Sequence, residues 1–503
     1  MKIAFLTSIS RKLNYRTIED EPLGGTHSAM INLASQMVKL GYQVTIFCNC
    51  QGFEGVYDGV EYIVLNKIIR YSKEKELDFL ICVASESALK VKIRAKRTIL
   101  WLHNDYSPYW QNELPDIASS ISKYMAVKSD KVVVVSQWQK SIIKNIFKIP
   151  ENHIVIKSNG VNTGLFDLKI PRNNKKIIYT SAPDRGLDLL LNIFPHLKKE
   201  IPELELHIYS SFKTWGKEED FLKEIENEVF EHTNQSGIFL HDPIPVRELA
   251  KQLLSSYLFV YPNHPSVDTY FNAETFCVSA LEAQAAGLPV ITSKRGALPE
   301  IVQNNQTGIL IDEEPYSQKY KEKLIAEIIK ILKDKKIWKS FSDNAVRWAK
   351  KYSWPVITQE WDTFLKDLLL ENEETKLNTV PLLPLFPEPE VSVIIPIYNR
   401  AENLKHVMNA LTRQTFKTFE VIVADDGSTD NTKEVVDSFR EVLNIRYAYG
   451  GPNKGFRAAR IRNIGLRKAR GKLIVFLDSD IVTPSIFLEE HLKAHQKYDK
   501  LVV

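Results

Sequence analysis

Cysteine and long apolar runs are both scarce in this sequence. The 503 residues include four cysteines, too few for a disulfide framework, and Cys48-x-Cys50 lacks the second ligand pair of a metal site. We therefore expect buried free thiols in a reducing compartment at Cys48, Cys50, Cys82 and Cys277. No stretch of about 18 apolar residues occurs, and the opening MKIAFLTSISRK has too short an apolar run for a secretory signal. These absences predict a cytoplasmic protein.

A surplus of charge of one sign is also missing. The 66 basic and 62 acidic residues give a formal net charge of +4. This near balance gives no argument for a nucleic-acid partner. The composition, 44% hydrophobic and 25% charged, is typical of globular proteins. The length suggests roughly three domain-sized units of about 150 residues each.

Short β-branched runs alternate with amphipathic stretches before the proline-rich region. They predict two successive series of buried parallel strands with helices or loops between them. The first series covers residues 2–7, 43–48, 78–84, 98–103 and 131–136, and the second covers 175–180, 204–210, 237–241, 257–262, 289–293 and 308–311. Two such sets favour two doubly wound α/β domains over one very wide sheet. The predicted domains are residues 1–166 and 167–370, the second including a closing helix in YSWPVITQEWDTFLKDLLLENEE.

A linker and a third α/β unit follow. Residues 371–390 are acidic and then proline-rich, with four prolines within residues 381–389. Proline at this density is incompatible with a helix or a central strand, so a semi-extended linker is predicted. Residues 391–503 resume the alternation, with strands predicted at 391–399, 419–426, 445–449 and 472–480.

The first candidate site combines a glycine pair with two glutamates. Gly24-Gly25 follows the first strand, where glycine lets backbone amides and a helix N-terminus approach an anion, although a tight turn explains the pair equally well. The spacing is not GxGxxG, which disfavours a nicotinamide enzyme. Glu274 and Glu282 are eight residues apart in a helix-forming run, so we expect both on one side of one helix, about 12 Å apart. That separation suits an extended ligand and is too wide for a hydrolase pair. Amides near 275–278 would face a diphosphate.

These segments, in this order, resemble the retaining glycosyltransferases of family 4. The matching segments are the Gly24-Gly25 loop, WLHND with His103, VVVVSQWQK with Ser136, KSNGVNTGLF with Asn159, SAPDRGLDLLL with Arg185, and Glu274-x7-Glu282. The resemblance implies a GT-B fold of two facing Rossmann-like domains and transfer from a nucleotide-sugar without a metal cofactor.

The same resemblance implies roles for individual residues. Glu282 would hold the ribose hydroxyls, and Gly24, Gly25 and Asn159 would also bind the donor. The catalytic residues would be Glu274 at the sugar and diphosphate, Arg185 at the phosphates and His103 across the cleft. Taken alone, His103 would be read as a satisfied core histidine.

One departure from the family pattern concerns the phosphate-binding cations. The family usually has an arginine and a lysine five positions apart before the first helix of the second domain. Here Arg185 stands at the lysine position, and Thr180 or Ser181 stands where the arginine would be. Lys294 and Arg295 in SKRGALPE are therefore candidates for the second cation.

The third unit resembles the inverting glycosyltransferases of family 2, which have a GT-A fold. The matching segments are VSVIIPIYNRAENL, FEVIVADDGSTDNT, the basic GFRAARIRNIG and KLIVFLDSD. Asp425 and Asp426 end a strand where a carboxylate can accept from a nucleotide base, and Asp478 also belongs to the predicted donor site. Asp478 and Asp480, two apart at a strand end, would bind Mg²⁺ or Mn²⁺ at a diphosphate.

The second site is expected to be incomplete in this chain. Only 23 residues follow Asp480, and inverting transfer needs a general base that this family places well beyond that strand. Glu489 and Glu490 follow directly, and a solvated helix face is their favoured role. We therefore expect the N-terminal half of a GT-A domain.

The sequence favours an enzyme with two modules that build one glycan from UDP- or GDP-sugar donors. The acceptor would be a glycan or a lipid-linked glycan. One alternative is a single active family 4 module with a non-catalytic nucleotide-binding module behind it. Another is a GT-B relative such as an epimerase or a phosphorylase, although no pyridoxal lysine motif is visible.

Contact with the inner face of a membrane is a further hypothesis. LKVKIRAKRTILW supplies five cations that could touch anionic headgroups, and a solvated surface before a strand is the favoured alternative. The cations are Lys90, Lys92, Arg94, Lys96 and Arg97.

Overall fold

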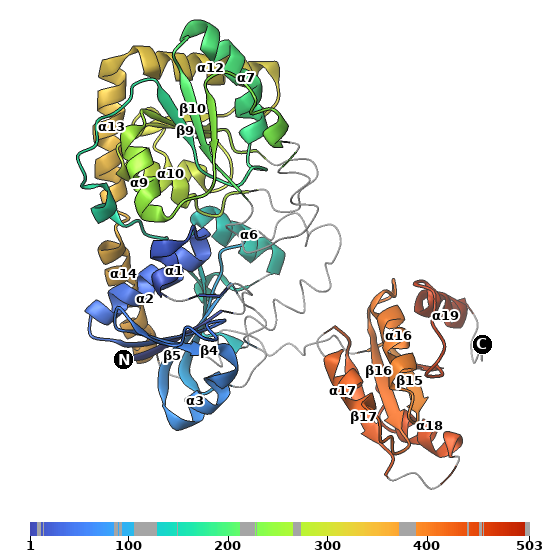
Figure 1. Ribbon diagram of the computed structural model, residues 1–503. Helices are drawn as coiled ribbons and strands as arrows, with labels where there is room; N and C mark the ends of the chain where they lie inside the picture. Colours follow the sequence, from blue (N-terminus) through green and yellow to red (C-terminus); the bar gives the residue numbers. More distant parts are fainter. Residues whose placement is uncertain are drawn as a thin grey trace. The chain divides into compact units, whose positions relative to one another are not determined.

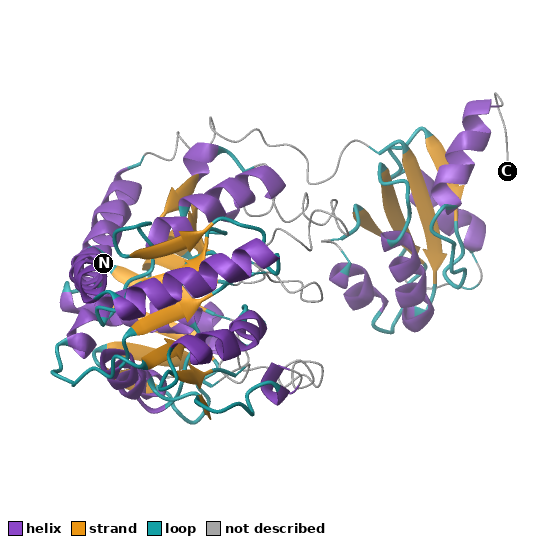
Figure 2. Cartoon of the chain, turned by 90° about the horizontal axis from the view of Figure 1, so that it is seen from above, coloured by secondary structure: helices purple, strands orange, loops and turns teal. Residues whose placement is uncertain are grey.

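The chain contains three β-sheets flanked by helices (Figures 1 and 2). The computed structural model describes residues 1–7, 12–13, 15–84, 89, 93–104, 128–147, 149–211, 227, 229–264, 273–371, 389–439, 442–451, 455 and 457–497. The first two sheets belong to one compact unit and the third belongs to another. The predicted α/β class is confirmed by these sheets.

The first sheet has eight strands in the order β3-β4-β2-β1-β5-β6-β7-β8. They are β1 (Lys2–Leu6), β2 (Gln43–Cys48), β3 (Gly55–Tyr57), β4 (Val60–Val64), β5 (Leu77–Val83), β6 (Ala95–Trp101), β7 (Lys131–Val134) and β8 (Ile154–Ile156). Only the pair β3–β4 is antiparallel among the described strands. All five predicted strands are present, and β3, β4 and β8 extend the sheet, with β3 and β8 at its edges.

Four helices and three short 3₁₀ turns accompany this sheet in the described residues. The helices are α1 (Tyr15–Asp20), α2 (Gly25–Lys39), α3 (Ile68–Glu74) and α6 (Gln137–Phe147). The 3₁₀ turns are η1 (Leu65–Lys67), η3 (Glu151–His153) and η4 (Thr163–Phe166). Buried residues recur along α2 at helical spacing, for example Met30, Leu33 and Met37, so one face of this helix packs into the core.

The second sheet has six strands, all parallel, in the order β11-β10-β9-β12-β13-β14. They are β9 (Lys176–Tyr179), β10 (Glu205–Tyr209), β11 (Ile238–His241), β12 (Leu258–Tyr261), β13 (Val290–Ser293) and β14 (Gly308–Ile311). The helices are α7 (Leu187–Glu200), α9 (Val246–Ser255), α10 (Val278–Ala285), α11 (Leu298–Ile301), α12 (Gln318–Lys333), α13 (Lys335–Lys350) and α14 (Trp354–Leu370). All six strands predicted for this region are present.

The closing helix α14 follows the second sheet in sequence but packs against the first sheet (Figure 1). The rings of Trp101 and Trp361 meet edge to face with centroids 5.0 Å apart. Arg97 Nε donates to the carbonyl of Leu368 at 3.0 Å, and Tyr42 Oη donates to Asp362. Because α14 returns across the module, it ties the two Rossmann-like domains together.

The third sheet has four parallel strands in the order β17-β16-β15-β18. They are β15 (Val391–Ile397), β16 (Phe419–Asp425), β17 (Ile445–Tyr449) and β18 (Leu473–Phe476). The helices are α16 (Ala401–Thr412), α17 (Thr432–Ser438), α18 (Ala458–Leu466) and α19 (Phe487–Lys497). This unit has its own core, which includes Val393, Leu404 and Val421, separate from the core of the first two sheets.

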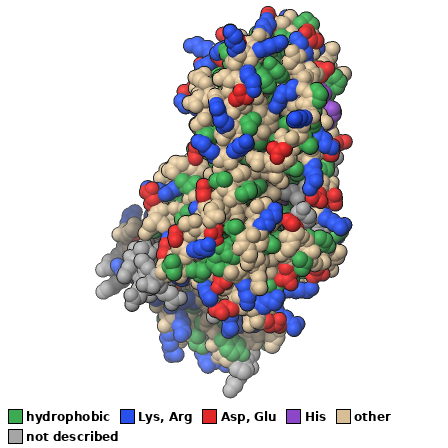
Figure 3. Space-filling model, turned by 90° about the vertical axis from the view of Figure 1, so that its left-hand side faces the viewer, with side chains coloured by type: hydrophobic (Ala, Val, Ile, Leu, Met, Phe, Trp, Pro, Cys, Tyr) green, Lys and Arg blue, Asp and Glu red, His purple; other side chains and the backbone are tan. Residues whose placement is uncertain are grey.

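The structure can be compared with the predictions about free cysteines and about contact with a membrane. All four cysteines are free and buried, as predicted. None of the described helices combines the length and apolar character that crossing a bilayer requires. Basic and acidic side chains are interspersed on the face shown in Figure 3. Of the five cations proposed to meet lipid, Lys90 and Lys92 lie outside the described residues.

Arg97 cannot contribute to a lipid-facing patch. Its side chain is buried, pairs with Asp130 at 3.7 Å and bonds to α14. Lys96 is exposed and forms an ion pair with Asp78 at 2.9 Å. That prediction was wrong for Arg97 because the alternation of β6 turns this side chain into the protein.

Candidate functional site

Glu274 lies between β12 and α10, ahead of the helix. α10 begins at Val278, with Cys277 as an extended N-cap (φ −81°, ψ 90°), so the prediction that one helix carries both Glu274 and Glu282 was wrong. The reason is a backbone contact made by the following loop. The amide of Ala297 donates to the carbonyl of Glu274 at 2.8 Å, and a Cβ at Gly296 would lie 2.6 Å from the same oxygen.

Two side chains bind the carboxylate of Glu274. Arg185 Nη1 and Tyr261 Oη both donate to Glu274 Oε1. The side chain of Glu274 is 8% exposed and that of Arg185 is 27% exposed, so solvent reaches part of the arginine side chain. Burial, and then the charge of Glu274, raise the pKa of Tyr261, which keeps its phenol protonated and able to donate.

Arg185 is placed by the tight loop between β9 and α7. Tyr179 Oη donates to the carbonyl of Ala182 at 2.7 Å and so fixes the start of the loop. Gly186 ends it with φ +87°, and a Cβ there would lie 2.0 Å from the carbonyl oxygen of Pro262. A positive φ and this close approach both require glycine. The loop therefore delivers Arg185 to the carboxyl ends of the central strands, where ligands of parallel α/β sheets bind.

Glu282 lies on α10 and faces a cavity between the two domains. The cavity measures about 140 Å³, and its lining includes Ser28 and Asn32 of α2 and Arg247 of α9. Burial raises the pKa of Glu282 to about 7. The carboxyl group therefore changes its charge within the neutral pH range. Glu282 and Glu274 face different surroundings, as expected if they bind different parts of an extended ligand.

His103 stands just past the end of β6. Its Nε2 lies 3.2 Å from Asn159 Oδ1, so the predicted residues His103 and Asn159 form a pair. Burial lowers the pKa of His103 to about 4, which leaves the imidazole neutral at neutral pH. Thr275 Oγ1 donates to the carbonyl of His103 at 2.7 Å. This bond joins the loop of His103 to the segment that carries Glu274.

The N-termini of α2 and α10 meet across the cleft. Gly24 is the extended N-cap of α2 (φ −65°, ψ 153°). A Cβ at Gly25 would lie 3.4 Å from Val278 Cγ2, at the start of α10. Because free amides and the positive end of the helix dipole lie at each N-terminus, the cleft suits an anionic ligand.

The two candidates for a second phosphate-binding cation are engaged elsewhere. Lys294 pairs with Asp312 at 2.7 Å, and Arg295 pairs with Glu314 at 2.8 Å. Of Thr180 and Ser181, the two residues considered at the position of the family's arginine, Thr180 is buried and Ser181 is half-buried. Of the sequence-derived candidates, only Arg185 lies beside Glu274.

Sequence reasoning missed two residues that bond to predicted site residues. Tyr261 binds Glu274, and Thr275 joins the two domains. Tyr261 ends a predicted strand, so the rule that ligands gather at the carboxyl ends of parallel strands could have singled it out. Thr275 had no such signal because its partner is a backbone carbonyl distant in sequence.

In the third sheet, Asp425 ends β16 and Asp426 directly follows it, and both have partners within the unit. Asp425 Oδ1 accepts from the amide and hydroxyl of Ser428 at 2.8 and 2.7 Å, and Tyr447 Oη donates to Asp425 Oδ2. Asp426 is buried and accepts from Arg457. The turn after β16 is therefore rigidly held.

Asp478 and Asp480 lie in a turn beyond β18. The strand ends at Phe476, so the prediction that the two side chains share a face of the strand was wrong. The amide of Ile481 donates to the carbonyl of Asp478 at 3.2 Å and closes the turn. Asp478 pairs with Arg462 at 2.8 Å, and Asp480 pairs with Arg400 at 3.3 Å. Both carboxylates are largely exposed, at 59% and 44%.

Comparison with protein families gives three successive matches along the chain. The sequence model of Glycosyltransferase Family 4 matches residues 23–165, and that of Glycosyl transferases group 1 matches residues 165–348. The model of Glycosyl transferase family 2 matches residues 392–503. The chain is a tandem of glycosyltransferase modules. Its first two sheets form the family 4 module and its third sheet forms the family 2 module, which confirms the predicted arrangement.

Curated relatives match short parts of this tandem glycosyltransferase. Validoxylamine A glucosyltransferase from Streptomyces hygroscopicus subsp. jinggangensis is 42% identical over 109 residues, which are 21% of this chain and 26% of the relative. Chondroitin synthase from Escherichia coli is 36% identical over 104 residues, 20% of this chain and 15% of the synthase. The chain thus spans about a quarter or less of these relatives' length.

Solved structures resemble the family 4 module in fold. Sucrose-phosphate synthase from Thermosynechococcus elongatus has a TM-score of 0.56 at 16% identity and covers 74% of this chain and 100% of its own. Anabaena HepE in complex with UDP-glucose has a TM-score of 0.56 at 14% identity, covering 73% and 100%. These structures confirm the predicted GT-B fold of two Rossmann-like domains.

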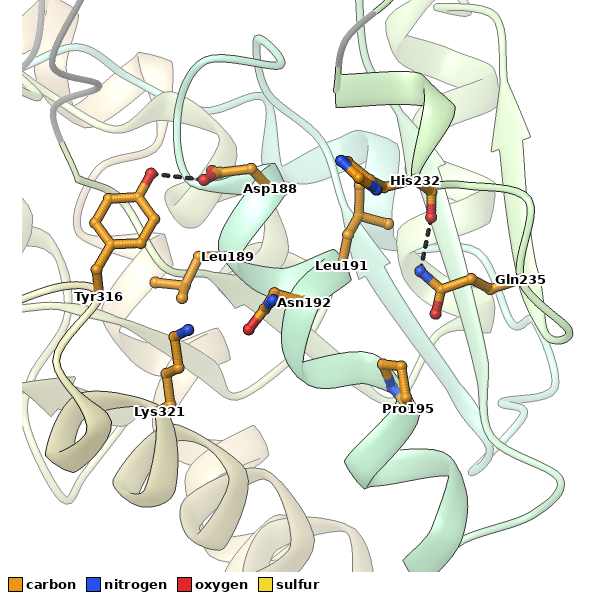
Figure 4. A pocket seen from close by; sticks show the side chains of 9 residues that line it. All are labelled: Asp188, Leu189, Leu191, Asn192, Pro195, His232, Gln235, Tyr316 and Lys321. Atoms are coloured by element: carbon orange, nitrogen blue, oxygen red, sulfur yellow. Dashed lines mark hydrogen bonds between the residues drawn. The ribbon is translucent and has the colours of Figure 1, made fainter.

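A larger cavity, about 410 Å³, lies beside α7 in the second domain (Figure 4). Asp188 is at one end of it, where Tyr316 Oη donates to Oδ2 at 2.6 Å and His264 Nε2 lies 3.2 Å from Oδ1. None of the residues predicted from the sequence is among the described residues that line this cavity.

Proposed function

We propose that the family 4 module transfers a sugar from a nucleotide-sugar donor, with retention of configuration and without a metal ion. The observation that carries this proposal is the meeting, in one cleft, of the Arg185–Glu274 pair with the His103–Asn159 pair. A guanidinium and two helix N-termini at one place are what a departing diphosphate needs. A UDP-sugar is the first donor to test because HepE was solved with UDP-glucose.

The proposed reaction gives each residue a role at a defined part of the donor. Glu282, when ionised, accepts hydrogen bonds from the ribose hydroxyls. Arg185 and the first amides of α10 bind the diphosphate, and Glu274 orients Arg185 and the sugar. The side-chain amide oxygen Oδ1 of Asn159 can only accept, so the proton of His103 is assigned to Nε2 and Nδ1 is an acceptor for a sugar hydroxyl. Because His103 is neutral, its proposed role is to accept a hydrogen bond from the sugar and not to supply a positive charge.

A donor screen tests the proposal. The chain is incubated with UDP- and GDP-sugars in the presence of a chelator, and NMR follows sugar release and the anomer formed on an added acceptor. Retention and a loss of turnover in Glu282→Ala are expected. Turnover that survives Glu282→Ala, or inversion in the presence of the chelator, would overturn the proposal.

For the family 2 module we propose inverting transfer that depends on Mg²⁺ or Mn²⁺ in the whole protein. Mg²⁺ is typically bound by one or two carboxylates together with substrate phosphates and water, and exposed Asp478 and Asp480 fit that pattern. The described residues contain no cluster of three or more protein ligands, so donor oxygens would complete the shell. The cation would neutralise the diphosphate, while the protein's part is to release Arg462 and Arg400 from the two carboxylates.

The alternative is a family 2 module that binds a nucleotide without turnover. The arginine pairs of Asp478 and Asp480 favour it, because they already neutralise both carboxylates. Titration of the chain with UDP and Mn²⁺ distinguishes the two proposals. Binding that Asp480→Ala abolishes, without any sugar transfer, would support the alternative.

The acceptor and the location belong to the same proposal. We propose a glycan acceptor, free or lipid-linked, and action at the cytoplasmic face of a membrane. Exposed Arg94, which directly precedes β6, and exposed Lys96 of β6 are the described cations that support membrane contact. Sedimentation with phosphatidylglycerol vesicles at low and high salt tests this, and a chain that stays in the supernatant at low salt would contradict it.

A further inference from the structure

Glu300 reaches from the second domain of the family 4 module to a helix of the first. It belongs to the short helix α11. Its Oε2 accepts from the amide of Gln137 at 2.8 Å, and its Oε1 accepts from the amide of Trp138 at 2.7 Å. These are the first two amides of α6, which have no partner inside their own helix. One carboxylate thus caps a helix of the other domain with both oxygens.

On its own side, Glu300 is connected to the backbone of Glu274. The amide of Glu300 donates to the carbonyl of Ala297 at 2.9 Å, and the amide of Ala297 donates to the carbonyl of Glu274 at 2.8 Å. The backbone of Gly296 also lies directly against that of Glu274, because a Cβ at Gly296 would be 2.6 Å from the carbonyl oxygen of Glu274. A displacement of α11 would therefore displace the Glu274 segment as well.

On the other side, α6 supports the loop that carries His103. Gln139, in the first turn of α6, donates through Nε2 to the carbonyl of Asn104 at 3.0 Å. Its Oε1 accepts from the amide of Val135 at 2.8 Å, and the side chain is 1% exposed. Because Asn104 directly follows His103, the position of α6 determines where His103 lies in the cleft.

We propose that Glu300 is a positioning residue that holds the two domains closed and aligns Glu274 with His103. A carboxylate suits this place because the positive end of the α6 dipole strengthens both hydrogen bonds, and two bonds fix an orientation that one would not. The exposed Arg247–Glu19 pair, at 2.8 Å, also crosses between the domains. It contributes less because solvent screens exposed ion pairs. This inference rests on the proposed function, since the alignment matters only if both residues meet one donor.

A distance between the two domains tests whether Glu300 holds them closed, and this measurement needs no turnover. Spin labels are attached to the full chain at Lys73→Cys on α3 and Ala326→Cys on α12, both exposed positions, while the native cysteines are buried. Distances are measured with and without UDP. We expect Glu300→Ala to shift a large part of the population to longer or broader distances. Distributions that match those of the unmodified chain would overturn the proposal.

A second variant removes the same interaction from the opposite side. Gln137→Pro deletes one of the two amides that donate to Glu300, and proline is well tolerated as the first residue of a helix. We expect a smaller shift in the same direction. Glu314→Ala is the matched control, because Glu314 is an exposed carboxylate of the same domain that pairs with Arg295. A control that opens the module as much as Glu300→Ala would contradict a specific role for Glu300.

Kinetic measurements distinguish an effect of Glu300 on the alignment of Glu274 with His103 from an effect on donor binding. For a donor that is turned over, Glu300→Ala should lower kcat about tenfold, while the Kd of UDP changes less than about threefold, because the closed state is depleted and not the donor site. An unchanged kcat would overturn the role in alignment. If no donor is turned over, the proposed function fails, and the label distances alone decide whether Glu300 closes the module.

Discussion

At the residue scale, Glu282 makes the family 4 module sensitive to pH. Burial raises its pKa from 4.5 to about 7, so between these values the folded chain holds a proton that the unfolded chain has released. Stability contributed by this proton is present below pH 4.5 and is lost as pH rises through about 7. The size of the pKa shift limits this contribution to the unfolding free energy to about 3 kcal/mol, and partial exposure of Glu282 reduces it to about 1–2 kcal/mol.

Glu282→Gln should therefore flatten the dependence of stability on pH. We expect the unmodified chain to lose more unfolding free energy than the variant between pH 5 and pH 8, measured by urea denaturation. UDP should bind more tightly as pH rises from 6 to 8, because the ionised carboxylate accepts from both ribose hydroxyls. Calorimetric titration that gave the same pH dependence for both chains would contradict the assignment.

The pair of Arg185 and Glu274 leads to a second prediction at this scale. Arg185→Met leaves the buried carboxylate of Glu274 without its cationic partner, and should lower the unfolding free energy by about 3 kcal/mol. Arg295→Met breaks a more exposed pair with Glu314 and should cost about 0.5 kcal/mol. Denaturant titration of both variants checks the difference. Adding Glu274→Gln to Arg185→Met should restore part of the loss, and no recovery would contradict the pairing.

At the element scale, the loop from β9 to α7 depends on one glycine. Gly186→Ala places a methyl group at φ +87° and 2.0 Å from the carbonyl oxygen of Pro262, so the loop must move. We expect a destabilisation of about 2–4 kcal/mol from the strained backbone and the clash, and a weaker affinity for UDP because Arg185 shifts. The matched control is Gly164→Ala, where the nearest atom would be Asn162 Oδ1 at 3.5 Å. Equal melting temperatures for the two variants would contradict this account.

Most strands of the three sheets could be predicted because buried parallel strands are short, continuous apolar runs. β3, β4 and β8 could not, since their burial patterns are mixed and resemble those of loops. The position of a candidate residue could be predicted where a motif followed such a strand, as with Arg185 and Asp425, while its role stays a prediction. It was not predictable where a distant loop decides the backbone, as Gly296 does for Glu274. Glu300 had no signal because it binds amides 162 residues away.

At the scale of the whole molecule, the two modules have separate cores. The family 4 module is one cluster that spans both of its sheets, with Phe5, Trp101, Ile177 and Trp361 among its members. The family 2 module has its own cluster, which includes Val393 and Leu404. Because burial of apolar surface drives folding and these cores share no residue, the modules should unfold as separate cooperative units.

Calorimetry of the full chain should therefore resolve two unfolding transitions that respond to different ligands. A ligand that binds only the native state raises the transition of the module that holds it. UDP with a chelator should raise the family 4 transition alone, because Arg185 and the helix N-termini need no metal. UDP with Mn²⁺ should raise both, and Asp480→Asn should abolish the metal-dependent part only. Glu282→Ala should abolish the metal-independent part only. A single transition, or an Mn²⁺ effect that survives Asp480→Asn, would contradict the division of the donor chemistry between the modules.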